Sequence, residues 1–133
     1  MTRFGIDPPT LLHVVRQQRR LDATHQLVAP NSLRTKALEL LLTEVRLGRL
    51  DDQEALRLHE RVTEQKVRLL GDRVSRRVAW DLARTHDWDL GVAEYLAVTR
   101  LQADALVTVD PALATAASGV VPLAAVEDLY SPG

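Results

Sequence analysis

Two acidic residues directly follow short apolar runs that have the composition of buried strands. Asp7 comes after Arg-Phe-Gly-Ile, and Asp110 comes after Ala-Leu-Val-Thr-Val, with Thr108 two positions before it. In α/β folds the carboxyl ends of parallel strands meet at one edge of the sheet, where function gathers. Each Asp could instead cap the helix that follows it. Two such acids together, with the nearby threonine, favour a shared site over two separate caps.

Two further acids lie in or just before a helix predicted at about 91–102. On a helical projection Glu94 falls between Val98 and Leu101, on a band that is otherwise apolar. We therefore expect either a buried basic or hydroxyl partner for this carboxylate or a metal ion. Asp89 lies one turn earlier, where it either caps the helix or reaches toward the same end of the sheet.

Short apolar runs alternate with longer helical patterns along the whole chain. The sequence predicts strands at 3–6, 26–29, 66–70, 105–109 and 120–124. It predicts helices after Pro8-Pro9, from Pro30 to Gly48, at 51–65, from Asp72 to about 87, at 91–102 and at 112–117. This alternation is typical of a three-layer α/β/α fold with a mainly parallel central sheet. The length of 133 residues predicts one domain over 1–133.

Composition narrows the class of protein. The chain contains no cysteine, which excludes disulfides and thiolate chemistry and suits a reducing cytoplasm. We expect no membrane span, because no apolar run is long enough. Net charge is −1, but residues 1–80 hold 15 Lys and Arg against 10 Asp and Glu, whereas residues 81–133 hold 2 against 8. The uneven charge suggests a basic rim around an acidic pocket.

Three segments carry a resemblance to a known family. FGIDPPTLL resembles the opening strand, acid and helix of PIN-domain nucleases, and LVAPNSLRTKALELL resembles their second strand and helix. AEYLAVTRLQADALVTVD resembles the helix and Thr-x-Asp strand end of VapC-type toxins. The resemblance covers essentially the whole chain and is most specific over 93–110. It implies a PIN-like fold and a cytoplasmic, homodimeric toxin that cleaves RNA with Mg²⁺ or Mn²⁺ and is paired with a VapB-like antitoxin.

The family pattern places four carboxylates around the metal, and this sequence matches two of them. Asp7 corresponds to the first, and Asp110, with Thr108, corresponds to the last. Lys36 stands where the second is expected, and Val92 stands where the third is expected. Metal affinity should therefore be lower than in a site with four acids.

Other acids could supply the missing oxygen ligands. In the nuclease hypothesis Asp7 and Asp110 are the core catalytic residues and metal ligands, and Glu94 or Asp89 supplies a third oxygen ligand. A helix advances 100° per residue, so Glu94 lies 200° around from Val92 and cannot simply replace a carboxylate there.

Lys36 permits two interpretations. The inward stripe predicted for its helix consists of Leu33, Ala37, Leu40, Leu41 and Leu47. Lys36 projects beside Leu40 and Leu47, so its ammonium group is expected to point at the strand ends and to reduce repulsion between carboxylates there. Alternatively it pairs with Glu39, three residues further along the helix.

Two short basic clusters could contact RNA phosphates or could form ordinary solvated helix faces. One contains Arg16, Arg19 and Arg20, and the other contains Arg73, Arg76 and Arg77.

Two functional hypotheses remain. The first is a metal-dependent endoribonuclease of VapC type with weakened metal binding, in which a water activated by the metal is the nucleophile. The second is a catalytically inactive PIN-like protein that binds RNA or an antitoxin-like partner. The family resemblance favours the first, and Lys36 and Val92 favour the second.

Overall fold

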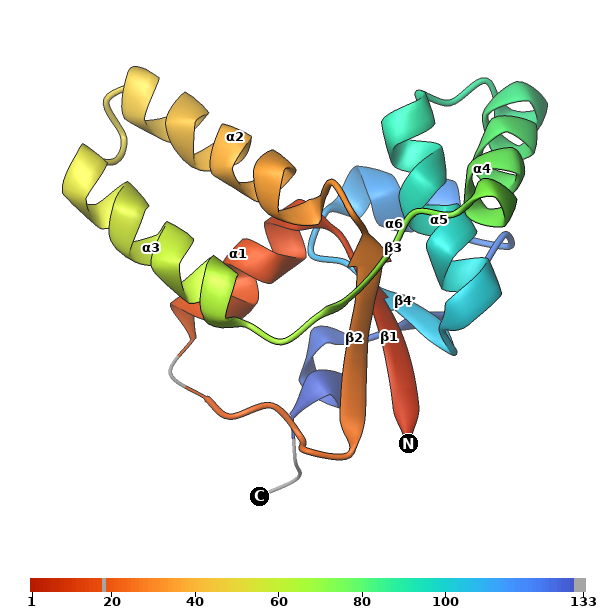
Figure 1. Ribbon diagram of the computed structural model, residues 1–133, viewed down its shortest axis with the longest axis horizontal. Coiled ribbons are helices and arrows are strands. Elements are labelled where there is room, and N and C mark those ends of the chain that lie inside the picture. The colour runs from red at the N-terminus through yellow and green to blue at the C-terminus, as the bar shows by residue number, and fades with distance from the viewer. Residues whose placement is uncertain (18, 131–133) are drawn as a thin grey trace.

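The strands are short, apolar and parallel to their neighbours. The computed structural model describes residues 1–17 and 19–130 (Figure 1). Its strands are β1 (Thr2–Ile6), β2 (His25–Pro30), β3 (Arg68–Leu70), β4 (Ala105–Val107) and β5 (Leu123–Ala124). They form a five-stranded, all-parallel sheet in the order β3-β2-β1-β4-β5. The strand β1 is therefore in the centre of the sheet. The three strands predicted at 66–70, 105–109 and 120–124 are shorter than expected.

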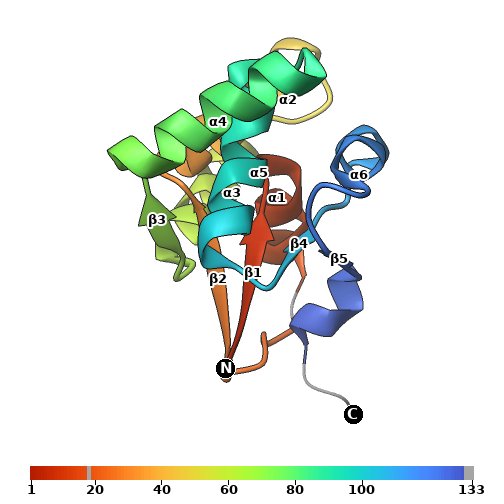
Figure 2. The same cartoon turned by 90° about the vertical axis from the view of Figure 1, so that its right-hand side faces the viewer.

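Helices cover both faces of this sheet, which confirms the predicted three-layer α/β/α fold (Figures 1 and 2). They are α1 (Pro8–Arg16), α2 (Leu33–Arg46), α3 (Asp52–Glu64), α4 (Arg73–His86), α5 (Leu90–Gln102) and α6 (Pro111–Ala117), followed by the 3-10 turn η1 (Val126–Leu129). One apolar cluster joins α1, α2, α3 and η1 to the sheet, and another joins α4, α5 and α6 to it. Within the described residues, no helix is long and apolar enough to cross a membrane.

Local sequence signals set several helix ends. Asp51 and Asp72 cap α3 and α4, because their carboxylates accept hydrogen bonds from the backbone N–H groups of Glu54 (2.7 Å) and Ser75 (2.8 Å). Gly48 adopts φ +73° and so allows the tight connection between α2 and α3.

The α5 helix approaches the sheet very closely at one point. A Cβ atom on Gly5 of β1 would collide with the Thr99 hydroxyl of α5. Thr99 is buried and donates that hydroxyl to the carbonyl of Tyr95. Glycine in the central strand thus allows α5, which carries Tyr95 and Glu94, to lie directly against β1.

The predicted inward face of α2 is partly wrong. Leu33, Ala37 and Leu41 are fully buried, whereas Leu40 is 39% exposed and Leu47 is 58% exposed. The buried residues follow an i, i+4 spacing that Leu40 does not share, and Leu47 lies beyond the last helical residue. Lys36 is exposed like Leu40 and Leu47, and it is not part of the buried face of α2.

Candidate functional site

A hollow of about 950 Å³ opens at the carboxyl edge of the sheet. Figure 1 shows the first turns of α2 and α5 on either side of the ends of β1 and β2. Its lining includes all the charged candidate residues and the two positions that depart from the family pattern: Asp7, Lys36, Asp89, Val92, Glu94 and Asp110. The fold therefore brings together residues from four separate parts of the sequence.

Asp7 is the most buried of these acids, at 3% exposure. It occupies the N-cap position of α1, but its side chain makes no cap hydrogen bond. The Thr10 hydroxyl donates to Oδ1, and the Thr108 hydroxyl donates to Oδ2 at 2.9 Å. Two prolines begin α1, so its first positions offer no N–H group, and the carboxylate is held by hydroxyls instead.

Backbone groups orient both of these hydroxyls. The N–H of Val109 donates to Thr10 Oγ1 and the N–H of Asp110 donates to Thr108 Oγ1, each at 3.0 Å. Each threonine oxygen thus accepts one hydrogen bond, and its own hydrogen is directed at Asp7. The two hydroxyls fix the Asp7 carboxylate and link it to the segment that carries Asp110.

Burial raises the pKa of Asp7 above its ordinary value of 3.8. The hydrogen bonds from Thr10 and Thr108, together with nearby backbone N–H groups, act in the opposite direction but do not cancel the effect. An ionised Asp7 is therefore costly in the isolated protein, and a neighbouring cation would relieve that cost.

Asp110 is both a helix cap and a lining residue of the hollow. Its Oδ1 accepts a hydrogen bond from the N–H of Ala112 at 3.0 Å, so it caps α6. Its Oδ2 has no hydrogen-bond partner among the described residues. The capping interpretation is correct for Asp110, yet one carboxylate oxygen is left for a ligand.

Glu94 has the hydroxyl partner that was one of the two expectations for it. Ser32 Oγ donates to Glu94 Oε2 at 3.3 Å, across the gap between the starts of α2 and α5. Asp89 is at the N-cap position of α5, as predicted, but its side chain makes no cap hydrogen bond.

Glu94 and Val92 both line the hollow, although they lie 200° apart around α5. Gly91 and Tyr95 line it as well, because the hollow wraps around the first turn of this helix. The first turn of α5 is therefore accessible from several sides, which an angular projection of the helix does not show.

Lys36 forms the ion pair that was its alternative interpretation. Its Nζ lies 3.3 Å from Oε2 of Glu39, and both side chains are more than half exposed. It also lines the hollow that contains Asp7 and Asp110. A pair this exposed contributes little stability, so Lys36 is readily available to a ligand.

Tyr95, Ser32 and Thr10 belong to the site and were missed as site residues. Tyr95 is 7% exposed, and its hydroxyl has no hydrogen-bond partner of normal geometry among the described residues. Burial, with the charges of Glu94 and Asp7, raises the pKa of Tyr95 to about 12, although the Ser32 hydroxyl nearby acts in the opposite direction. The only sequence signal for Thr10 was its position three residues after Asp7.

The carboxylates of the hollow fit a partly hydrated metal ion but not an ion enclosed by protein ligands. No group of three or more His, Asp or Glu side chains in the described residues is arranged to enclose a metal ion. However, Mg²⁺ commonly keeps several waters and binds through one or two carboxylates together with substrate phosphates. Asp7, whose ionised form is costly without a cation, and the free oxygen of Asp110 fit such a partly hydrated ion.

Comparisons with known proteins bear on the fold. No family model matches the chain, and no curated protein matches it. Among solved structures, PAE2754 from Pyrobaculum aerophilum aligns with a TM-score of 0.69 at 21% sequence identity, over 96% of this chain and 94% of that one. At this level of identity the similarity demonstrates a shared fold over nearly the whole of both chains.

Proposed function

We propose that this protein is a metal-dependent endoribonuclease of the PIN-domain, VapC-type toxin class. The supporting observation is that Asp7, Lys36, Val92 and Asp110, the four positions at which the resemblance places carboxylates, line one hollow. Two of the four are acids, and Asp7 is fixed by two oriented threonine hydroxyls. The remaining acids of the hollow, Glu94 and Asp89, lie at its α5 side.

The side chains divide the reaction between them. Asp7 and Asp110 would hold the cation, which when bound would neutralise phosphate charge and lower the pKa of water. Glu94, oriented by Ser32, accepts the proton of the attacking water. Lys36, which lines the hollow, contacts the RNA phosphate, since its pairing with Glu39 is exposed and weak.

Cleavage of a labelled structured RNA tests this proposal. We expect cleavage with millimolar Mn²⁺ or Mg²⁺, none with a chelator, and a loss of more than about a hundredfold in Asp7→Asn. Asp81→Asn is the matched control, because Asp81 is an exposed acid of α4 that pairs only with Arg77 among the described residues. Cleavage that survives Asp7→Asn would indicate a contaminating nuclease and would refute the assignment.

A second candidate function is a catalytically inactive PIN-like protein that binds RNA or an antitoxin-like partner. The observation that favours it is Lys36 and Val92 at the hollow in place of two acids. Under this alternative the wild-type protein binds RNA without cutting it, with or without metal. The combined change Lys36→Glu and Val92→Asp should then create Mn²⁺ affinity and cleavage that the wild type lacks.

The partners form part of the same proposal. A VapC-type protein is expected in the cytoplasm as a homodimer that also binds a VapB-like antitoxin. Light scattering of the purified protein measures its oligomeric state. The antitoxin partner is tested by co-purification with a small DNA-binding protein that is encoded in a neighbouring reading frame. A monomeric protein that does not bind this product would contradict both expectations.

A further inference from the structure

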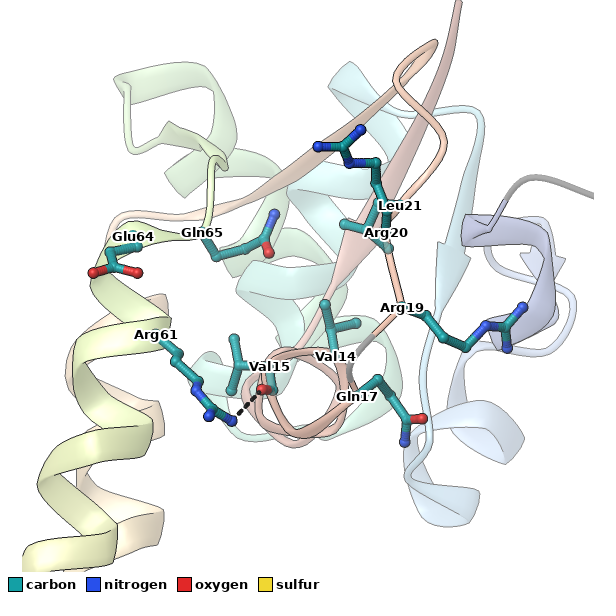
Figure 3. A pocket seen from close by; sticks show the side chains of 9 residues that line it. All are labelled: Val14, Val15, Gln17, Arg19, Arg20, Leu21, Arg61, Glu64 and Gln65. Atoms are coloured by element: carbon teal, nitrogen blue, oxygen red, sulfur yellow. Dashed lines mark hydrogen bonds between the residues drawn. The ribbon is translucent and has the colours of Figure 1, made fainter.

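The hollow that contains Asp7 and Asp110, called the acidic hollow or acidic site below, lies at the start of α1. A second hollow, of about 440 Å³, lies at the opposite end of this helix (Figure 3). We call it the arginine hollow; its polar lining consists of Gln17, Arg19, Arg20, Arg61, Glu64 and Gln65. Buried Val14 and Val15 of α1, with Leu21, form its apolar part. The helix α1 begins beside Asp7 and ends at this hollow, so it connects the two sites.

Two of the three arginines are available to a ligand. Arg19 is occupied: it pairs with Glu127 at 2.9 Å, stacks over Tyr130 at 4.0 Å, and in Figure 3 turns away toward η1. Within the part of the chain that the structure describes, Arg61 makes only a long contact of 3.4 Å to the carbonyl of Val15. Arg20 has no ion pair or hydrogen bond within the described residues. Glu64 is the single acid in the lining, so the arginine hollow has a clear excess of positive charge.

The surface of α1 between the two hollows carries no acid. Pro9, which lines the acidic site, is followed at helical spacing by His13 and Arg16 on the same face. Gln17 and Arg20 then continue into the arginine hollow. At 1.5 Å per residue, the nine residues of α1 separate the two sites by about 13 Å. A few nucleotides of single-stranded RNA can bridge that distance.

We propose that the arginine hollow binds neighbouring backbone phosphates of the RNA strand whose scissile phosphate lies at Asp7 and Asp110. The inference rests on the proposed function. Arg20 and Arg61 lie on different sides of the hollow (Figure 3), so each donates to a different phosphate of the strand. Val14 and Leu21 provide an apolar surface for the ribose. The strand follows the exposed face of α1, past His13 and Arg16, where the nearby acid Glu127 of η1 is already paired with Arg19.

The test measures RNA affinity by fluorescence anisotropy, in an Asp7→Asn background that prevents cleavage. The probes are labelled oligouridylates of two and about twelve nucleotides, since only the longer one can span both hollows. Arg20→Ala combined with Arg61→Ala should weaken binding of the longer probe about tenfold and lower its salt slope by about 1 to 2, with little effect on the shorter one. Arg84→Ala, which removes an exposed arginine of α4 outside the described hollows, should change neither.

Each outcome decides between the inference and the function on which it rests. Wild-type affinity in the double arginine variant overturns the inference, even if wild-type protein cleaves RNA and Asp7→Asn does not. Arginine-dependent binding without any cleavage by the wild type supports the arginine hollow and refutes the nuclease. A labelled polyglutamate peptide is the alternative probe: if it binds with the affinity of the longer RNA and the same arginine dependence, the hollow is an acidic-peptide site and the inference is wrong.

Discussion

Asp7 combines near-complete burial with two hydrogen bonds from oriented threonine hydroxyls. Its pKa is raised chiefly by burial, so the folded protein favours the protonated form more than the unfolded chain does. The free energy of unfolding should therefore fall as pH rises from about 3.8 through the raised pKa. Because ionising the buried Asp7 carboxyl costs free energy, we expect a cation beside it.

Asp7→Asn should remove this component of the pH dependence. Urea denaturation without metal, at pH 4 and pH 7, should show that the variant gains stability relative to the wild type as pH rises. Any constant difference from the altered hydrogen bonds cancels when the two pH values are compared. A wild type and variant whose difference is the same at both pH values would show that the carboxylate of Asp7 is not destabilised by burial.

Tyr95→Phe should cost little stability. The Tyr95 hydroxyl has no hydrogen-bond partner of normal geometry among the described residues, so its removal leaves no other buried group unsatisfied. We expect a change in unfolding free energy within about 0.5 kcal/mol, or a small gain. Thr10→Val is the contrasting variant, because it leaves the N–H of Val109 and one Asp7 oxygen unpaired and should cost about 1–3 kcal/mol. A large loss in Tyr95→Phe would reveal a partner for its hydroxyl.

The sequence identified some site residues and not others, for physical reasons. Asp7 and Asp110 were predictable because each follows a strand, and parallel strands end at the same edge. Tyr95 and Ser32 were not, because their roles depend on how the first turns of α2 and α5 face each other. Thr10 looked like an ordinary helical residue until its hydroxyl proved to be directed back at Asp7.

At the level of elements, the placement of the site depends on how closely α5 packs against β1. Gly5→Ala should destabilise the fold by about 1–3 kcal/mol, because the added methyl group meets the Thr99 hydroxyl in a fully packed region. Thr99→Ala removes that obstacle, so the double variant should recover much of the loss. Chemical denaturation of the four proteins in a double-mutant cycle measures the coupling. Additive effects would mean that α5 does not contact β1 at this point.

The elements themselves were largely predictable, and the errors have a common cause. Apolar periodicity and turn residues predict the position of each α-helix. The predicted buried face of α2, however, includes leucines that are exposed. Leu40 and Leu47 are apolar yet substantially exposed, since Leu40 borders the hollow and Leu47 lies past the helix end. Hydrophobicity alone does not distinguish a core leucine from one that faces a binding hollow.

At the scale of the whole molecule, two hollows of opposite character lie at the two ends of α1. The acidic hollow contains two acids that the resemblance would assign to metal, and the arginine hollow contains the cations that an RNA strand requires. A protein ion site with only two fixed carboxylates binds weakly on its own. Mg²⁺ at a few millimolar, without RNA, should therefore raise the melting temperature by no more than about 1–2 °C, measured by differential scanning fluorimetry. A much larger shift that Asp7→Asn abolishes would instead indicate a complete protein metal site.

The central claim is that Asp7 and Asp110 bind a divalent ion together with an RNA phosphate. Calorimetric titration of Mn²⁺ into the wild-type protein, with and without a saturating uncleavable RNA analogue, tests it most directly. We predict at least about tenfold tighter Mn²⁺ binding in the presence of RNA, by reciprocal coupling, and no such gain in Asp7→Asn. Equal Mn²⁺ affinity with and without RNA, or a gain that persists in Asp7→Asn, would contradict the account.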